Sequence, residues 1–182
     1  MNIGVFCSAR DLGPEYTEPV IDFAKHIGEH KHTLIWGGSD TGLMHLVADG
    51  VQQAGGKIVG VTIAHYAANL DKKADEMVMA KDLFDRKRIM IERSDAFVIL
   101  VGGIGTLDEV TDAMELKREH MHDLPIVMLN TNNFYEPLRE QLKVMERGGF
   151  LDYPLTDLVD FADNSHAALD IIVAKTGLDK HA

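Results

Sequence analysis

Residues 96–106 read AFVILVGGIGT: an apolar run, then a glycine-rich turn, then the start of a helical pattern. The apolar run has no polar interruption, which is typical of a strand in a sheet whose two faces are both covered by helices. A buried strand that passes through a tight turn directly into a helix is the repeating unit of α/β proteins. This stretch therefore predicts an α/β fold, and the sequence on either side repeats the same alternation.

Apolar runs and amphipathic segments alternate along the whole chain. The runs predict strands at residues 3–7, 34–36, 57–61, 96–101, 126–129 and 158–161. Helical spacing predicts helices at residues 15–30, 42–54, 82–93, 106–120, 134–147 and 165–175, with a loop and a short helix at 64–74. Asp82 and Asn164 are expected N-caps, and Gly148 with Gly149 is expected to end a helix.

Connections of this length join parallel strands through right-handed crossovers. We therefore expect a single doubly wound, Rossmann-like domain over residues 1–182, with a mainly parallel central sheet flanked by helices. In such a sheet, ligands bind beyond the carboxyl ends of the strands. Three strand exits are rich in small or polar residues, at 7–10, 37–42 and 102–106. If the strands are parallel, these loops meet in one crevice.

The acidic composition limits the partners. The chain has 29 acidic against 18 basic residues and a net charge of −11, which repels nucleic acid and anionic membranes at long range. A small anionic substrate stays compatible with this charge, because local dipoles dominate over a few ångströms. Cys7 is the single cysteine, so no intrachain disulfide is expected, and neither a signal peptide nor an apolar stretch of roughly 20 residues is present. These features predict a cytoplasmic protein without a nucleic-acid or membrane partner.

The turn at residues 102–106 has two interpretations. Its glycines leave backbone amides unhindered at the positive end of a helix dipole, which is how many proteins hold a phosphate group. The spacing differs from the dinucleotide signature, and no lysine follows the glycines as in nucleoside-triphosphate loops. Thr106 and Glu109 also fit a capping box with Thr106 as N-cap, in which case the glycines only shape the turn. The loop alone leaves both interpretations open.

A charged run precedes this strand at residues 82–88. Asp82 and Arg86 are four residues apart, so on a helix they form a weak pair, and a solvated face is the default interpretation of such a run. Spacing alone does not distinguish Arg86 from Arg88 or Arg93.

Metal and thiol chemistry find little support in the pattern. Histidines cluster at residues 26–32 and 120–122, but no cysteine or acidic residue completes a ligand set, so no metal site is predicted. Cys7 ends a predicted strand and is expected to be a packed thiol rather than a nucleophile.

Taken together, these segments resemble the LOG family of cytokinin-activating enzymes, whose members were long named lysine decarboxylases. The resemblance rests on residues 5–8 (VFCS), 36–44 (WGGSDTGLM), 54–61 (AGGKIVGV), 84–87 (FDRK, for H-x-R-K) and 101–109 (VGGIGTLDE, for P-G-G-x-G-T-x-x-E). Glu109 follows Arg86 by 23 positions, the spacing expected of the family. Order and spacing together make the resemblance specific.

The resemblance implies a phosphoribohydrolase that cleaves the N-glycosidic bond of a plain or N6-substituted adenosine 5′-monophosphate, giving the free base and ribose 5-phosphate. It also implies a homodimer and no metal or organic cofactor. Arg86 and Glu109 would be the catalytic pair: the carboxylate would stabilise an oxocarbenium-like state or activate water, and the arginine would contact either the base or the phosphate. The implied substrate-binding residues are Ser8, Gly38, Lys87, Gly102, Gly103, Ile104, Gly105, Thr106 and Asp112.

The chain departs from the family pattern at several positions. Val101 replaces the proline before the glycines, Leu83 and Phe84 replace Met-His, Asp108 and Asp112 replace glutamates, Arg118 replaces glutamine, and Met114 and Leu116 replace aromatic residues. The catalytic pair is kept, so the departures concern the identity of the base.

A second class of function stays open: a non-catalytic carrier of a phosphorylated, nucleotide-like cofactor, as in related molybdopterin carriers. A phosphate loop serves both classes, whereas a carboxylate beside the sugar is needed only by the enzyme. A lysine decarboxylase fits poorly, because it needs pyridoxal phosphate on a Schiff-base lysine, and Lys87 is the only lysine among the implied site residues.

Overall fold

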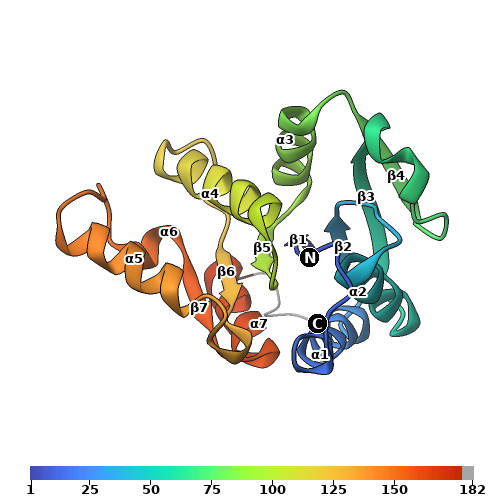
Figure 1. Ribbon diagram of the computed structural model, residues 1–182, viewed down its shortest axis with the longest axis horizontal. Coiled ribbons are helices and arrows are strands. Elements are labelled where there is room, and N and C mark those ends of the chain that lie inside the picture. The colour runs from blue at the N-terminus through green and yellow to red at the C-terminus, as the bar shows by residue number, and fades with distance from the viewer. Residues whose placement is uncertain (178–182) are drawn as a thin grey trace.

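The computed structural model describes residues 1–177 and contains a seven-stranded sheet between two layers of helices (Figure 1). The strands are β1 (Asn2–Phe6), β2 (Thr33–Trp36), β3 (Lys57–Ile63), β4 (Glu76–Ala80), β5 (Ala96–Ile99), β6 (Ile126–Leu129) and β7 (Asp160–Ala162). Every pair of neighbouring strands is parallel, in the order β4-β3-β2-β1-β5-β6-β7. The predicted doubly wound α/β fold is confirmed.

Helices cover both faces of the sheet (Figure 1). One face carries α1 (Pro14–Glu29), α2 (Gly42–Gln53) and α7 (Ser165–Thr176). The other carries α3 (Leu83–Arg93), α4 (Ile104–Arg118), α5 (Glu136–Arg147) and α6 (Leu155–Leu158). Two short 3-10 helices complete the described chain, η1 (Ala64–Asn69) and η2 (Thr131–Asn133). No helix within residues 1–177 is both long enough and apolar enough to cross a bilayer.

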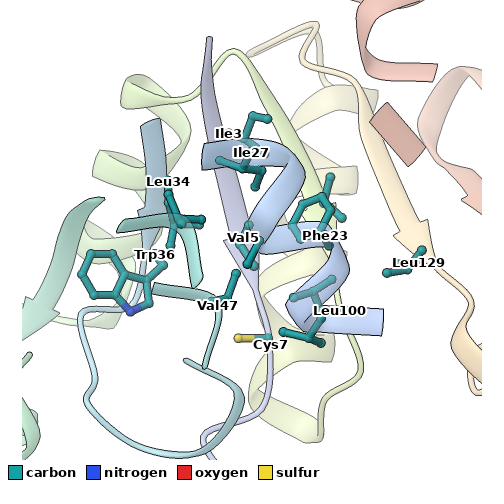
Figure 2. Packing of buried hydrophobic residues seen from close by; sticks show 14 of the residues in the cluster. Ile3, Val5, Cys7, Phe23, Ile27, Leu34, Trp36, Val47, Leu100 and Leu129 are labelled. Atoms are coloured by element: carbon teal, nitrogen blue, oxygen red, sulfur yellow. The ribbon is translucent and has the colours of Figure 1, made fainter. Parts of the chain in front are cut away.

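The core on the α1 side explains why the central strands are continuous apolar runs. Phe23 and Ile27 of α1 lie over Ile3 and Val5 of β1, and all four side chains are fully buried (Figure 2). The opposite face of the same strands packs against a second apolar cluster under α3 and α4. Burial of each such side chain stabilises the fold by about 1.5–3 kcal/mol. Because both faces of these strands are buried, apolar residues occupy consecutive positions along them.

The strand order reverses direction beside β1. Strands β2, β3 and β4 follow on one side of β1, whereas β5, β6 and β7 follow on the other. The loops that leave β1 and β5 therefore diverge and open a crevice between them, which is where doubly wound sheets bind ligands. The two loops touch at the edge of the sheet, where the Ser8 amide donates a hydrogen bond to the Val101 carbonyl (3.1 Å).

The sequence pattern missed β4. This strand lies at the edge of the sheet and pairs only with β3, through partners such as Val61 and Val78. Its residues are mostly half-buried or exposed, with Met79 53% exposed. An edge strand is not enclosed on both sides, so it needs no continuous apolar run, and the periodic signal is weak.

Several predicted boundaries were wrong, and two of them concern β7 and α4. Residues 158–161 were expected to form a strand, but a helical turn, α6, ends at Leu158 and β7 begins at Asp160. Leu155 and Leu158 are buried on one side of that turn, so their apolar character reflects helix packing. The helix expected from residue 106 begins at Ile104, with Gly103 as its N-cap.

The three predicted helix caps were confirmed. The Asp82 side chain accepts a hydrogen bond from the Asp85 amide, and the Asn164 side chain accepts one from the Ala167 amide. After α5, Gly149 adopts a left-handed φ of 74°, and the Phe150 amide bonds back to the Met145 carbonyl. This is the Schellman ending, in which glycine avoids the steric cost of a positive φ.

Candidate active site

A pocket of about 580 Å³ opens at the carboxyl edge of the sheet, over the point where the strand order reverses. Its wall is drawn from the exits of four strands and from helices α2, α3 and α4. The lining residues are 5–10 at the end of β1; Gly37, Ser39 and Thr41 after β2; Met44 of α2; Thr62, Tyr66 and Asn69 around the end of β3; Arg86 of α3; and residues 103–106 and Glu109 at and within the start of α4, after β5. The parallel sheet thus gathers segments that lie far apart in the sequence.

The first turn of α4 forms one end of this pocket. Gly103, Ile104, Gly105 and Thr106 all line it. The capping-box interpretation was wrong: Gly103 is the N-cap, no side chain caps the helix, and Thr106 lies inside it. The unpaired amides of this turn therefore remain available to a ligand, at the positive end of the helix dipole.

The fold itself does not require two of the glycines in this loop. A Cβ atom added to Gly103 or Gly105 would meet nothing within 4 Å, and neither residue has a positive φ. Gly102 differs, because a Cβ there would lie 2.1 Å from Thr106 Oγ1. Gly102 thus shapes the turn, whereas the open space at Gly103 and Gly105 suits the close approach of a ligand to the backbone.

Arg86 and Glu109 form a buried ion pair in the pocket wall. Arg86 Nη1 lies 2.5 Å from Glu109 Oε1, and the two side chains are 9% and 13% exposed. Arg86 Nε donates a second hydrogen bond to the Val61 carbonyl at 2.8 Å, which fixes the guanidinium beside the end of β3. The expected pair with Asp82 and the expected solvated face were therefore wrong, since Arg86 points inward.

Gly37 makes room for this arginine. A Cβ atom at Gly37 would lie 2.2 Å from Arg86 Nη2 and 2.1 Å from the terminal carbon of Met44. Contacts this short do not occur in proteins, so any larger residue would push the guanidinium out of place. The glycine-rich loop after β2 serves here to admit a side chain.

Burial sets the ionisation of two groups in the wall. Desolvation raises the pKa of Glu109, and the charge and hydrogen bond of Arg86 oppose this effect only in part. A raised pKa in a carboxylate beside a pocket is typical of catalytic sites. Burial also raises the pKa of the Cys7 thiol, as expected of a packed thiol.

Four of the residues named from the sequence do not line the pocket: Gly38, Lys87, Gly102 and Asp112. Lys87 Nζ lies 3.2 Å from Asp108 and 3.3 Å from Asp112, so the two carboxylates hold the ammonium away from the cavity. Gly38 has a φ of 75° and shapes the loop after β2. The pocket does receive Ser8, Arg86 and Glu109, together with residues 103–106.

Sequence reasoning also missed several residues of the wall. Arg10, Ser39 and Thr41 lie in loops that were expected at this edge but were not singled out. Thr62, Tyr66 and Asn69 follow a strand that was predicted to end at residue 61. If the strand had been predicted to run to Ile63, its exit would also have been expected to line the crevice.

Comparison with known proteins relates the chain to a family. Residues 44–172 match the model of the family described as "Possible lysine decarboxylase". The chain is 34% identical to the cytokinin riboside 5′-monophosphate phosphoribohydrolase of Mycobacterium tuberculosis over 169 residues, which cover 92% of this chain and 90% of that one. It is 31% identical to the protein of the same name from Mycobacterium marinum, with the same coverage.

Among solved structures, the chain is similar to the molybdenum cofactor binding protein of Rippkaea orientalis. The TM-score is 0.73 and the identity is 20%, over 95% of each chain. At this identity the likeness shows a shared fold and does not extend to a shared ligand.

Proposed function

The chain belongs to the family described as "Possible lysine decarboxylase", and we propose that within this family it is a nucleoside 5′-monophosphate phosphoribohydrolase. It cleaves the N-glycosidic bond of an adenosine 5′-monophosphate and releases the free base and ribose 5-phosphate. The observation that carries the proposal is the buried Arg86–Glu109 pair, held in the wall of a pocket that ends at the first turn of α4. The names of relatives at 34% and 31% identity support the same activity.

The first turn of α4 is the proposed phosphate site. Residues 103–106 line the pocket, and the space around Gly103 and Gly105 is open. Because these two residues have no side chain, a phosphate group can approach the backbone amides of the turn directly. Holding the phosphate fixes the ribose and places its anomeric carbon for reaction. Glu109, on the same helix about one turn further, then lies beside the sugar.

Glu109 acts where positive charge develops. As the bond between C1′ and the base nitrogen breaks, its electron pair leaves with the base and C1′ becomes oxocarbenium-like. The Glu109 carboxylate stabilises this charge or accepts a proton from the attacking water, whose oxygen forms the new bond to C1′. The released base takes up a proton, which balances the reaction.

Arg86 supports the departing base in this proposal. Its Nε and Nη1 are engaged by Val61 and Glu109, while Nη2 lies on the side of Gly37, toward the exit of β2. That side is away from α4, where the phosphate is proposed to bind. Of the two partners considered from the sequence, this position favours the base.

The family's description as a decarboxylase does not suit the residues of the pocket. Pyridoxal-dependent decarboxylation needs a lysine that can form a Schiff base with the cofactor. Within residues 1–177, no lysine lines the pocket, and Lys87 is held between Asp108 and Asp112.

The proposal includes a homodimer in the cytoplasm. Leu83, Phe84 and Ile104 lie at the starts of α3 and α4 and are 45%, 79% and 82% exposed. Apolar surface of this kind beside a pocket is typical of an interaction site, and a second copy of the chain would cover it. Cys7 is the single cysteine, so the fold depends on no intrachain disulfide, which is compatible with a reducing compartment.

Base release tests the activity directly. The purified protein is incubated with AMP and with N6-isopentenyl-AMP, without added metal, and the free base is quantified by chromatography. We expect release from at least one nucleotide, and a loss of at least about a hundredfold in Glu109→Gln. Glu115→Gln is the matched control, because Glu115 lies on the same helix but is exposed and pairs with Arg118 outside the pocket.

Binding without cleavage would favour the carrier function instead. If neither nucleotide is cleaved although calorimetry shows that both bind, the protein is a carrier and other phosphorylated ligands should be screened. If neither binds, the proposed phosphate site at α4 is wrong.

A further inference from the structure

The pocket contains a buried hydroxyl group that lacks a hydrogen-bond partner. Thr62 is the penultimate residue of β3, its side chain is 1% exposed, and it belongs to the pocket wall. Within residues 1–177, its Oγ1 has no hydrogen-bond partner. A buried hydroxyl in this state destabilises the free protein, so such groups are rare unless a ligand or a water completes them.

Other polar side chains surround this end of the pocket. Asn69 lines the wall, and its side-chain amide makes no hydrogen bond to the described part of the chain. Two backbone hydrogen bonds hold this segment in place, from the Asp40 amide to the Asn69 carbonyl (2.8 Å) and from the Asp71 amide to the Gly38 carbonyl (3.0 Å). Ser39 Oγ and Thr41 Oγ1 lie 2.9 Å apart in the adjoining loop. The hydrogen-bonding groups are therefore held on an ordered frame.

The position of these groups relates them to the base of a bound nucleotide. The proposed phosphate site follows β5, and Thr62 lies on β3, which is separated from β5 by β1 and β2. Three strand spacings amount to about 14 Å along the edge of the sheet. A nucleotide whose phosphate binds at α4, and whose ribose lies beside Glu109, extends its base toward β2 and β3.

We propose that this end of the pocket recognises the polar edge of an unsubstituted purine, so that the substrate is a purine nucleoside 5′-monophosphate without an alkyl chain on its exocyclic nitrogen. This inference rests on the proposed function of the same site. A free exocyclic amino group and the ring nitrogen beside it offer hydrogen bonds to Thr62 and Asn69. An N6-isopentenyl chain offers apolar groups there and leaves both side chains unpaired.

The exposed apolar residues of the wall do not form an alternative subsite at this depth. Ile104 is 82% exposed and Tyr66 is 42% exposed, which places them at the mouth of the pocket. Thr62, which is 1% exposed, lies deeper, where the loss of a hydrogen bond discriminates most strongly between substrates, and Asn69 lies nearer the mouth.

The test compares kcat/KM for AMP and for N6-isopentenyl-AMP in the wild type and in Thr62→Val, which replaces the hydroxyl by a methyl group of similar size. We expect the wild type to prefer AMP by at least about tenfold. Thr62→Val should lower kcat/KM for AMP about tenfold and change that for N6-isopentenyl-AMP less than about twofold. Thr62→Ser, which keeps a hydroxyl, should rescue the preference for AMP.

Thermal unfolding separates recognition from a structural role. Because the Thr62 hydroxyl is unpaired in the free protein, Thr62→Val should unfold at the same temperature as the wild type or about 2–4 °C higher. If the hydroxyl served to stabilise the fold, the same variant would unfold at a lower temperature, and the inference would be wrong.

The inference and the proposed function fail in different ways. A wild type that prefers N6-isopentenyl-AMP, or a Thr62→Val variant that slows both nucleotides equally, overturns the inference and leaves the phosphoribohydrolase intact. If neither nucleotide is cleaved, the proposed function fails. Calorimetric dissociation constants for the two nucleotides then decide the inference alone, and it is overturned if Thr62→Val does not weaken the binding of AMP relative to N6-isopentenyl-AMP.

Discussion

Arg86 and Lys87 are neighbours on α3, and the fold gives them different surroundings. Arg86 turns into the pocket wall and meets Glu109, whereas Lys87 meets Asp108 and Asp112 outside the cavity. The two cations reach carboxylates on the same helix, α4, from adjacent positions of α3. A shift of one residue in the packing of α3 would therefore exchange a candidate catalytic group for a structural one.

The raised pKa of Glu109 predicts the acid side of the pH profile. If the ionised carboxylate is the active form, kcat/KM falls as the pH drops through this pKa, above the ordinary range of a glutamate. The Arg86 charge lowers this pKa, so in Arg86→Gln the residual activity should decline at a still higher pH. Rates measured between pH 4 and pH 9 test both statements, and an acid limb at lower pH in Arg86→Gln would contradict them.

Arg10 is expected to contact the substrate's phosphate. It lies on the loop after β1, lines the same pocket as the first turn of α4, and has no ion pair within residues 1–177. Arg10→Gln should raise KM for AMP about tenfold and leave any cleavage of adenosine unchanged, because adenosine has no phosphate.

The exposed Arg147 provides the control for that variant. Arg147→Gln changes the net charge equally but lies at the end of α5, outside the pocket. If both variants weaken AMP alike, the effect is one of overall charge, and Arg10 has no specific contact.

At the scale of elements, the turn between β5 and α4 contains one glycine that shapes the chain, Gly102, and two whose surroundings are open, Gly103 and Gly105. Gly102→Ala places a Cβ atom 2.1 Å from Thr106 Oγ1 and should destabilise the protein by about 1–3 kcal/mol. Gly105→Ala meets nothing within 4 Å and favours the helix, so the unfolding temperature should hold or rise. Thermal unfolding measures both variants.

The same pair of variants also tests the phosphate site. Gly105→Ala should weaken AMP binding despite its intact stability, because the added methyl group occupies the space proposed for the phosphate. Calorimetry with AMP measures this effect, and unchanged affinity would place the phosphate elsewhere.

The elements that the sequence predicted well are those whose pattern is set by burial on both sides. The strands around residues 96–101 and 126–129 were found because both faces meet apolar clusters. The edge strand β4 was missed because its residues are half-buried, and β7 was misplaced because Leu158 is buried by the helical turn before it. Periodicity reports burial, so it fails where an element is exposed or where a turn is buried.

The candidate site was predicted in part for a related reason. Topology placed the loops after β1, β2 and β5 at one edge, and the family resemblance singled out Arg86 and Glu109. Spacing could not indicate that Lys87 is held by two carboxylates or that Thr62 lies in the wall without a partner. Both facts depend on how side chains pack across elements.

At the scale of the whole molecule, the apolar surface at the starts of α3 and α4 predicts self-association. Phe84 is 79% exposed, so the substitution Phe84→Asp should not disturb the core. We expect the wild type to have twice the chain mass of 20.2 kDa in solution, and Phe84→Asp to shift toward the single chain. Light scattering after size-exclusion chromatography measures the mass.

Phe150→Asp is the matched control, because Phe150 is 81% exposed but follows α5, away from these two helix starts. Equal dissociation by both variants would mean that the interface lies elsewhere.

The central place of β1 has a consequence for the synthesis of the protein. β1 is the first strand to leave the ribosome, but its partner β5 comes more than ninety residues later, as the pairing of Ile3 with Ala96 shows. The strand can pair with β2 early, yet its other edge stays open until β5 has emerged. A nascent chain that has reached only α3 thus exposes the edge of its central strand, and at this stage a chaperone or a slow rate of translation would protect it most.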